Sequence, residues 1–384
     1  MTAMADVIVS NEPGHASVGI IDLSGDDLGL PTPVHVREAA KRALDEGATH
    51  YTTRPGLDSL RRAVAGKLLR ENSLTVDPER EVLITCGTQE ALFVALHVLL
   101  ERGDEAIIPE PARDAYAGIA RLAGARVRSI SGAAAHGFAI DLDMLARRLT
   151  KRSRVVILGA PLVPAGVVHG EAVLEGLAAL AIERNLVIVS DEIAEPFVYD
   201  GAFHRSIGSL PGMAERTITI NGFATAYAMH GWRVGYMAGP QPLLGPMMQL
   251  KQALSICSPA VSQYAALAAI SGPRAPIERA RSLGEERRDA VCLALKKASI
   301  PHVRPMAGQY VMLDGSATGI SGQALVRYVM RHTRVLLSCT ATTRSATASW
   351  LRLSLTQPSD QLVAAVGRLA PVLTRPGFQG GTHG

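Results

Sequence analysis

Short apolar runs alternate with longer segments of helical periodicity along most of this chain. Apolar runs between turn residues predict buried strands, and apolar positions that recur every three or four residues predict helices packed on a core. A repeated succession of strand and helix is typical of a mainly parallel sheet covered by helices. The expected strands are 82–85, 105–108, 155–158, 186–190 and 217–220, and the expected helices are about 33–46, 57–71, 89–102, 112–123, 143–149, 170–184 and, with a break near Pro259, 241–269.

The same pattern divides the chain into two α/β units. A long polar helix is expected at 274–297, and it leads into a second unit that ends near residue 373. A chain of 384 residues is long enough to form two domains. We therefore expect a large domain over 46–275 and a small domain over 276–373 that includes the N-terminal segment 1–45. The glycine-rich end, 374–384, is expected to be mobile.

Composition and charge exclude several classes of protein. The formal net charge is only +4 and the basic residues are dispersed, so a nucleic-acid partner is not expected. The chain has no apolar run long enough to span a bilayer and no signal-peptide pattern at its start. Its four cysteines contain no CxxC pair and match neither a disulfide framework nor a zinc site. These features predict a cytoplasmic protein with no membrane partner and no metal site.

Five motifs occur in a fixed order along the chain. They are Tyr51-Thr-Thr-Arg-Pro-Gly56, Cys86-Gly-Thr-Gln-Glu-Ala91, Asp191-Glu-Ile193, Gly231-Trp-Arg-Val-Gly235 and Trp350-Leu-Arg-Leu353. The second motif follows a predicted strand and opens a predicted helix, whose N-terminus attracts anions. From Asp22 to about Leu373, the chain resembles the class I/II (fold type I) aminotransferases. The resemblance implies an α/β fold in which a large domain has a mostly parallel seven-stranded sheet between helices, next to a smaller α/β domain.

The resemblance also implies a cofactor site and a substrate site. In that family a turn and an arginine hold the phosphate of pyridoxal phosphate (PLP), an aspartate pairs with its pyridine nitrogen, and a second arginine clasps the substrate carboxylate. A tyrosine reaches the phosphate of the neighbouring subunit, which implies a homodimer with shared sites. The matching residues are Gly87, Thr88, Gln89 and Arg233 for the phosphate, Asp191 for the nitrogen, Arg352 for the carboxylate and Tyr51 for the neighbouring subunit.

Thr225 stands where the family has the lysine that binds PLP covalently. That family segment reads Ser-Phe-Ser-Lys, five further residues, and then Gly-Trp-Arg, whereas this chain has Gly222-Phe-Ala-Thr225 before Gly231. A hydroxyl cannot form an imine with an aldehyde, so a covalently bound cofactor is not expected. Of the six lysines of the chain, Lys251 is the nearest in sequence to Thr225. We expect it to be a solvated lysine on a helix face.

Further departures from the family fall on the same site. The residues that hydrogen-bond to the cofactor ring or stack on it in that family are replaced here. A phosphate ligand is also replaced, as is the Pro-Gly pair that precedes the arginine that binds the substrate carboxylate. An engineered change would remove the lysine alone, so linked losses indicate natural divergence. Each lost contact costs about 1 kcal/mol or more of cofactor affinity, which argues against tight PLP binding. The replacements are Val163, Ala194, Arg113, Gly222 and the pair Cys339-Thr340.

Four residues are candidates for a new chemistry, and each has a plainer alternative. Asp191, without a pyridinium partner, is a candidate general acid or base, or else it pairs with a nearby Arg or His. His230 is a candidate for proton transfer, because imidazoles exchange protons near neutral pH, or it is structural. Thr225 is a proton-relay hydroxyl or a small space-filling residue. Arg113 stacks on or pairs with the substrate, or it lies exposed on its loop.

These residues lead to one main hypothesis and two rivals. The main hypothesis is a PLP-independent enzyme of specialised biosynthesis that uses acid/base catalysis on a small molecule with a carboxylate and does not perform ordinary transamination. The first rival binds PLP or pyridoxamine phosphate (PMP) non-covalently. The second is a catalytically silent protein that binds ligands or regulates an active relative. Uptake of PLP by the purified protein separates the first rival from the other two readings.

Overall fold

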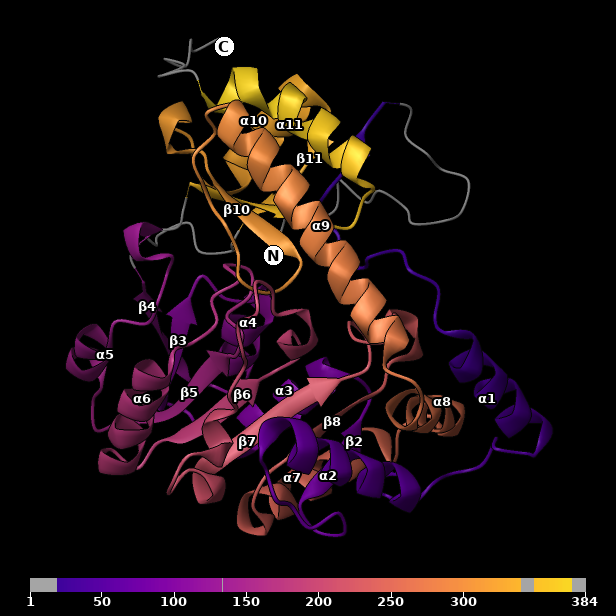
Figure 1. Cartoon of the computed structure of the whole chain (residues 1–384). Coiled ribbons are helices and arrows are strands. Elements are labelled where there is room, and N and C mark those ends of the chain that lie inside the picture. Colours follow the sequence, from indigo (N-terminus) through magenta and orange to yellow (C-terminus); the bar gives the residue numbers. More distant parts are fainter. Residues whose placement is uncertain (1–18, 133, 340–348, 375–384) are drawn as a thin grey trace.

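The computed structural model describes residues 19–132, 134–339 and 349–374, which form a large lower unit and a smaller upper unit (Figure 1). The predicted mobile end lies almost entirely outside these residues. The long helix α9 (Ala275–Lys297) runs from the large unit into the small one (Figure 1). This arrangement is the α/β fold expected from the sequence, while the domain boundaries at 45/46 and 275/276 stay a prediction.

The large unit is built on a seven-stranded sheet with the order β2-β8-β7-β6-β5-β3-β4. Neighbouring strands are parallel except β8, which is antiparallel to both β2 and β7. The carboxyl ends of β5 and β6 are aligned, with Gly159 paired to Asp191. The strands are β2 (Val82–Thr85), β3 (Glu105–Glu110), β4 (Arg126–Ser131), β5 (Ser153–Gly159), β6 (Val187–Asp191), β7 (Thr217–Gly222) and β8 (Gly235–Ala238).

Helices cover both faces of this sheet, which explains why its strands are continuously apolar. Along β5, Val155 and Ile157 belong to one buried cluster, whereas Val156 and Leu158 belong to another on the opposite face. A parallel strand buried on both faces needs apolar residues at every position. The helices on one face are α3 (Thr88–Leu99), α4 (Asp114–Leu122) and α7 (Gln241–Ser255), and those on the other are α2 (Asp58–Asn72), α5 (Leu142–Arg148), α6 (Glu171–Glu183) and α8 (Ala260–Ser271).

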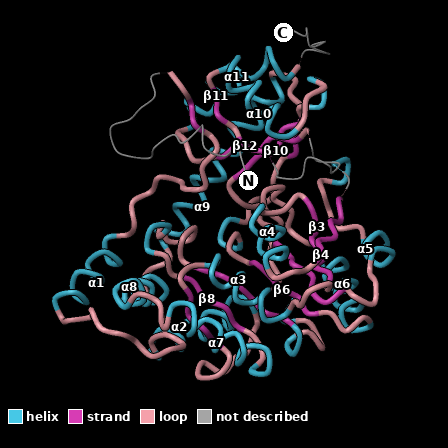
Figure 2. The backbone as a smooth tube through the Cα atoms, turned by 180° about the vertical axis from the view of Figure 1, so that it is seen from behind, coloured by secondary structure: helices cyan, strands magenta, loops and turns pink. Residues whose placement is uncertain are grey.

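The small unit contains an antiparallel sheet with the order β12-β13-β10-β9. N-terminal β1 (Ile21–Asp22) pairs with β11 (Val335–Leu336), whereas the following α1 (Val34–Asp45) packs against α8 of the large unit. Figure 2, from behind, shows this N-terminal stretch passing alongside both units. The remaining elements are β9 (His302–Val303), β10 (Tyr310–Asp314), β12 (Ser338–Cys339), β13 (Trp350–Ser354), α10 (Gly322–Thr333) and α11 (Ser359–Leu373).

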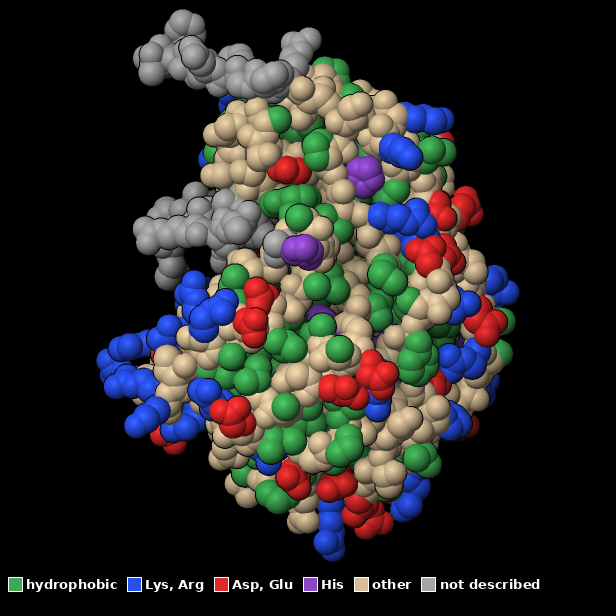
Figure 3. Space-filling view, turned by 60° about the vertical axis from the view of Figure 1, so that its left-hand side comes forward, with side chains coloured by type: hydrophobic (Ala, Val, Ile, Leu, Met, Phe, Trp, Pro, Cys, Tyr) green, Lys and Arg blue, Asp and Glu red, His purple; other side chains and the backbone are tan. Residues whose placement is uncertain are grey.

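Charges of both signs are spread over the large unit. In Figure 3, Lys and Arg side chains gather at the lower left edge, and Asp and Glu side chains lie among them and across the middle. Within the described residues, no helix is both long and apolar enough to cross a membrane.

Candidate functional site

A cavity of about 320 Å³ brings together residues from both units and from the N-terminal segment. It lies beyond the carboxyl ends of β6 and β7, which is where an open α/β sheet places its ligands. Eight residues singled out from the sequence line it: Thr88, Gln89, Arg113, Val163, Ala194, Thr225, His230 and Arg233. The other lining residues are Asp26, Ile193, Phe197, Ala224, Gly308, Gln309 and Tyr310.

One end of the cavity is shaped to hold an anion. Gly87 has φ +81° and immediately precedes α3, and a Cβ there would lie 2.6 Å from Arg233 Nη2. Arg233 itself has φ +50° and donates from Nη1 to the carbonyl of His230 at 3.2 Å. A guanidinium therefore stands against the N-terminus of a helix, and both favour negative charge. Gly222, at the family's serine position, packs here too, since a Cβ would lie 3.0 Å from Thr88 Cγ2.

At the other end, Asp191 is held by two donors. Arg113 Nη1 and Tyr116 Oη donate to its Oδ2 at 2.5 Å and 2.7 Å. Burial opposes the charge of Arg113, but the Asp191 carboxylate outweighs it and raises the pKa of the guanidinium above its ordinary value. Burial, together with Asp191, also raises the pKa of Tyr116 well above its usual range, so Tyr116 stays a donor. Of the sequence alternatives, the paired Asp191 and the inward Arg113 are the ones observed.

Arg352 does not line this cavity itself but lies on β13 against the ring of Tyr310, which does. Its Nε donates to Ser338 Oγ at 2.7 Å and its Nη2 donates to the carbonyl of Ser24 at 3.2 Å. The guanidinium carbon lies 4.6 Å from the centroid of the Tyr310 ring. The Pro-Gly departure before this arginine falls partly outside the described residues, because only Cys339 of the pair is described.

Thr225 and His230 line the same cavity without a lysine beside them. All six lysines lie in the described part of the chain, and none of them lines this cavity. His230 Nδ1 lies 3.4 Å from Asp27 Oδ1, so the imidazole has a carboxylate neighbour. Val163 and Ala194, which replace two hydrogen-bonding residues of the family, also face the cavity.

The expectation of a solvated Lys251 is wrong. The residue is fully buried, and its Nζ has no hydrogen-bond partner within the described residues. Burial lowers the pKa of the amine from its ordinary value. The sequence carried a signal for this, because Leu244, Met247 and Lys251 recur at helical spacing and form the buried side of α7.

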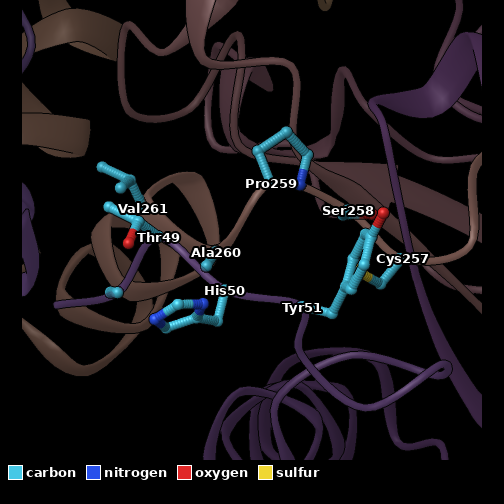
Figure 4. Close-up of a pocket in the computed structure, with 9 residues that line it drawn as sticks. Thr49, His50, Tyr51, Cys257, Ser258, Pro259, Ala260 and Val261 are labelled. Carbon is cyan, nitrogen blue, oxygen red and sulfur yellow. The ribbon is translucent and has the colours of Figure 1, made fainter.

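Tyr51 does not reach this cavity within its own chain. Its side chain is 79% exposed and lines a separate hollow of about 870 Å³. Figure 4 shows its ring beside Cys257 and Ser258. This position is compatible with a contact to a second subunit.

Sequence reasoning missed a buried polar cluster behind β6. Glu192, Glu195 and His204 have potential ligand atoms within 4.8 Å of one another, a geometry that could hold a metal ion. The carboxylates already have protein partners, because Asn72 Nδ2 donates to Glu192 at 3.0 Å and to Glu195 at 2.7 Å. Lys67 also donates to Glu195, and the cluster is therefore satisfied by the chain itself.

Comparison with known proteins identifies the family. The aminotransferase class I and II model matches residues 18–369. The chain is 34% identical to aromatic-amino-acid aminotransferase 2 of Thermococcus litoralis, with 92% of each chain covered, and 33% identical to aspartate aminotransferase of Pyrococcus abyssi, with 93% of each covered. The structure of Thermus thermophilus aspartate aminotransferase with maleate superposes with a TM-score of 0.87 at 34% identity, covering 92% of each chain. The chain belongs to the class I and II aminotransferase family.

These relatives correct the main functional hypothesis. A PLP-independent enzyme without ordinary transamination was expected, but relatives at this identity over nearly the whole chain are named aminotransferases. They point to PLP-dependent transamination, and the expectation of a PLP-independent enzyme is wrong. The chain belongs to an enzyme family, and PLP is the cofactor which that family suggests.

The residues present fit this cofactor at its phosphate. A Cβ at Gly87 would fill the cradle between the turn and Arg233, so the backbone there is adapted to a close approach. Asp191, at the end of β6, is the residue that would pair with a pyridine nitrogen, and its Oδ2 is engaged by Arg113 and Tyr116. A pyridine nitrogen that approached Oδ2 would compete with the guanidinium of Arg113.

Proposed function

We propose that the protein is an aminotransferase that binds PLP or PMP without a covalent bond. One observation carries this proposal: Thr88, Gln89 and Arg233 line the same cavity as Arg113, the partner of Asp191, while Thr225 stands at the lysine position. PMP carries its own amine and needs no imine to be retained, so it suits a site without lysine. When bound, the cofactor would supply an amino group and an electron-accepting ring.

The anion end would supply most of the cofactor affinity. The helix N-terminus at Thr88 and the guanidinium of Arg233 would hold the phosphate as charge-assisted partners. Asp191 would hold the pyridine nitrogen once Arg113 has moved away. Val163 and Ala194 offer no hydrogen bond to the ring, so affinity on that side would be lower than in a relative with polar residues there.

Proton transfer is proposed for His230, and substrate binding for Arg352. His230 lines the cavity together with Thr225, and its Nδ1 lies 3.4 Å from Asp27 Oδ1. The relatives' names indicate amino acids as substrates, and Arg352 would hold the carboxylate of an amino acid or a 2-oxo acid. Thr225 would be a hydroxyl relay between His230 and the reacting carbon.

We further propose a cytoplasmic homodimer. Tyr51 is exposed and lies outside the cavity that contains Thr225 and Arg233 of the same chain. It would reach the phosphate bound by the neighbouring subunit.

The test is uptake of PLP and PMP by the purified protein, followed by absorbance and intact mass before and after borohydride. The wild type is expected to bind both cofactors stoichiometrically and lose them on dialysis, with no added mass after reduction. The Thr225→Lys variant is expected to gain the mass of one reduced PLP adduct, because its amine would lie in the cavity. Absence of chromophore uptake by the wild type would refute the proposal.

A further inference from the structure

Arg352 has a carboxylate of the chain itself as its neighbour. Its Nη2 lies 3.4 Å from Oδ1 of Asp26, which lines the cavity. Tyr310 Oη donates to the same oxygen at 2.5 Å. Burial, reinforced by Asp26, raises the pKa of Tyr310 above its usual range, so the phenol remains protonated and keeps donating. Asp26 therefore sits where a carboxylate bound by Arg352 would lie.

The backbone holds Asp26 in this place from both sides. Leu23 is fully buried, donates its N–H to Leu336 at 2.8 Å and accepts from Ser354 N–H at 3.0 Å. Leu28, on the other side of Asp26, is 4% exposed. A segment anchored at both ends loses little further entropy when Asp26 contacts Arg352. The backbone around Asp26 is thus anchored, and the hydrogen bond from Tyr310 holds its carboxylate beside Arg352.

The remaining bonds of Arg352 leave little freedom to avoid Asp26. Its Nε is directed to Ser338 Oγ and its Nη2 to the carbonyl of Ser24, two residues before Asp26. A guanidinium recognises a carboxylate best through a planar fork, and part of that fork is already engaged. A carboxylate ligand must therefore approach Arg352 past the negative charge of Asp26.

We propose that Asp26 is a specificity-determining residue that competes with the substrate carboxylate for Arg352. The inference rests on the proposed function, in which Arg352 is the carboxylate site. The Asp26 side chain is 65% exposed and that of Arg352 is 22% exposed, so solvent screens the pair and a ligand can displace it. Substrates with a carboxylate consequently bind weakly. The affinity of amines or carbonyl compounds with no carboxylate on the reacting carbon is not lowered by Asp26.

The test is calorimetric titration of maleate into the wild type and the Asp26→Asn variant. Maleate is a suitable probe because it is named as the ligand of the Thermus relative. Removing the competing charge is expected to tighten maleate binding about three- to fivefold, the upper range for a screened ion pair. The matched control is Asp27→Asn, the same change one residue on, where the carboxylate faces His230 at 3.4 Å. That control is expected to change the affinity less than about twofold.

Two further variants locate the probe and guard against misfolding. Arg352→Gln is expected to abolish the gain produced by Asp26→Asn, because the gain depends on the freed guanidinium. Tyr310→Phe keeps the Asp26 charge but removes the hydrogen bond that fixes it, so a smaller tightening is expected. Equal maleate affinity in the wild type and in both Asp26→Asn and Tyr310→Phe would overturn the inference, as would a gain that survives Arg352→Gln.

PMP uptake by the same preparations separates this inference from the proposed function. If Asp26→Asn tightens maleate binding while no variant takes up PMP, Asp26 is confirmed as the competitor and the aminotransferase proposal fails. If PMP binds normally and Asp26→Asn changes nothing, the competitor role alone is refuted.

Discussion

At the scale of single residues, the replacement of an aromatic by Arg113 has the largest consequence for the cavity. The guanidinium reaches Asp191 from the N-terminus of α4. The carboxylate proposed to hold the cofactor is therefore already paired within the chain. A ligand that needs Asp191 must compete with this contact. Its apparent affinity is its intrinsic affinity multiplied by the fraction of molecules in which Arg113 is displaced.

Replacing Arg113 by leucine is expected to raise PMP affinity about tenfold, because the ring no longer competes with a guanidinium. The same change leaves Asp191 with Tyr116 as its side-chain donor. Because Arg113 is 28% exposed, the free energy of unfolding is expected to fall only about 1 to 3 kcal/mol. Both effects are measurable, by spectroscopic titration with PMP and by urea unfolding.

Arg121→Leu, an exposed position of the same helix, is the matched control and should leave PMP affinity unchanged. If Arg113→Leu instead weakened PMP binding, Arg113 would be a cofactor contact.

At the scale of elements, the end of β6 joins the cavity to the buried cluster of Glu192 and His204. Burial opposes the ionisation of Glu192, but His204 and the hydroxyls of Ser206 and Ser190 outweigh it and hold its pKa below the ordinary value. Burial likewise opposes a charged His204, but the Glu192 and Glu195 carboxylates raise its pKa above the ordinary value. The pair is therefore charged and mutually stabilising across mildly acidic pH.

The stabilisation by this pair should depend on pH in a defined direction. The His204 contribution is complete below about pH 6.5 and is lost as pH rises through its raised folded pKa. The Glu192 contribution is complete above about pH 4.5 and is lost as pH falls through its lowered folded pKa. His204→Gln is therefore expected to destabilise the protein by about 1 to 3 kcal/mol between these values and by less at pH 9.

Urea unfolding of the wild type and His204→Gln across this pH range measures the difference. Burial lowers the pKa of His169 to about 4, so both proteins lose stability as pH falls from 6.5 toward that value. This shared loss largely cancels when the two curves are subtracted. A difference that stays constant with pH would show that His204 acts through packing alone.

Five of the seven strands of the large sheet were predictable from the sequence because their signals are local, whereas β4 and β8 were not predicted. Continuous apolar strands and 3.6-residue periodicity located β2, β5 and α9 to within two residues. Local motifs also singled out Gly87 and Arg233, which the fold brings together. The contact of Asp26 with Arg352 joins segments more than three hundred positions apart, and no spacing rule encodes such a meeting. Tyr116 was missed for a similar reason, since only the fold brings it to Asp191.

At the scale of the whole molecule, Tyr51 lines the separate hollow of about 870 Å³ and is largely exposed to solvent in a single chain (Figure 4). A tyrosine that is 79% exposed next to Cys257 and Pro259 has a clear use if a second copy covers this face. The expected assembly has twice the 40.6 kDa mass of one chain, as measured by light scattering.

Mixing two defective variants tests whether the sites are shared. Arg233→Gln removes a phosphate partner of a subunit's own site, and Tyr51→Phe removes one from the site of its neighbour, so each homodimer is expected to bind PMP at least tenfold more weakly. In a mixed dimer, one site receives both defects and the other receives none. After random exchange, half of the dimers are mixed, and about a quarter of all sites should regain wild-type affinity. If each site were built from a single chain, the subunit carrying Tyr51→Phe would bind PMP as the wild type does before any mixing, and mixing would restore nothing.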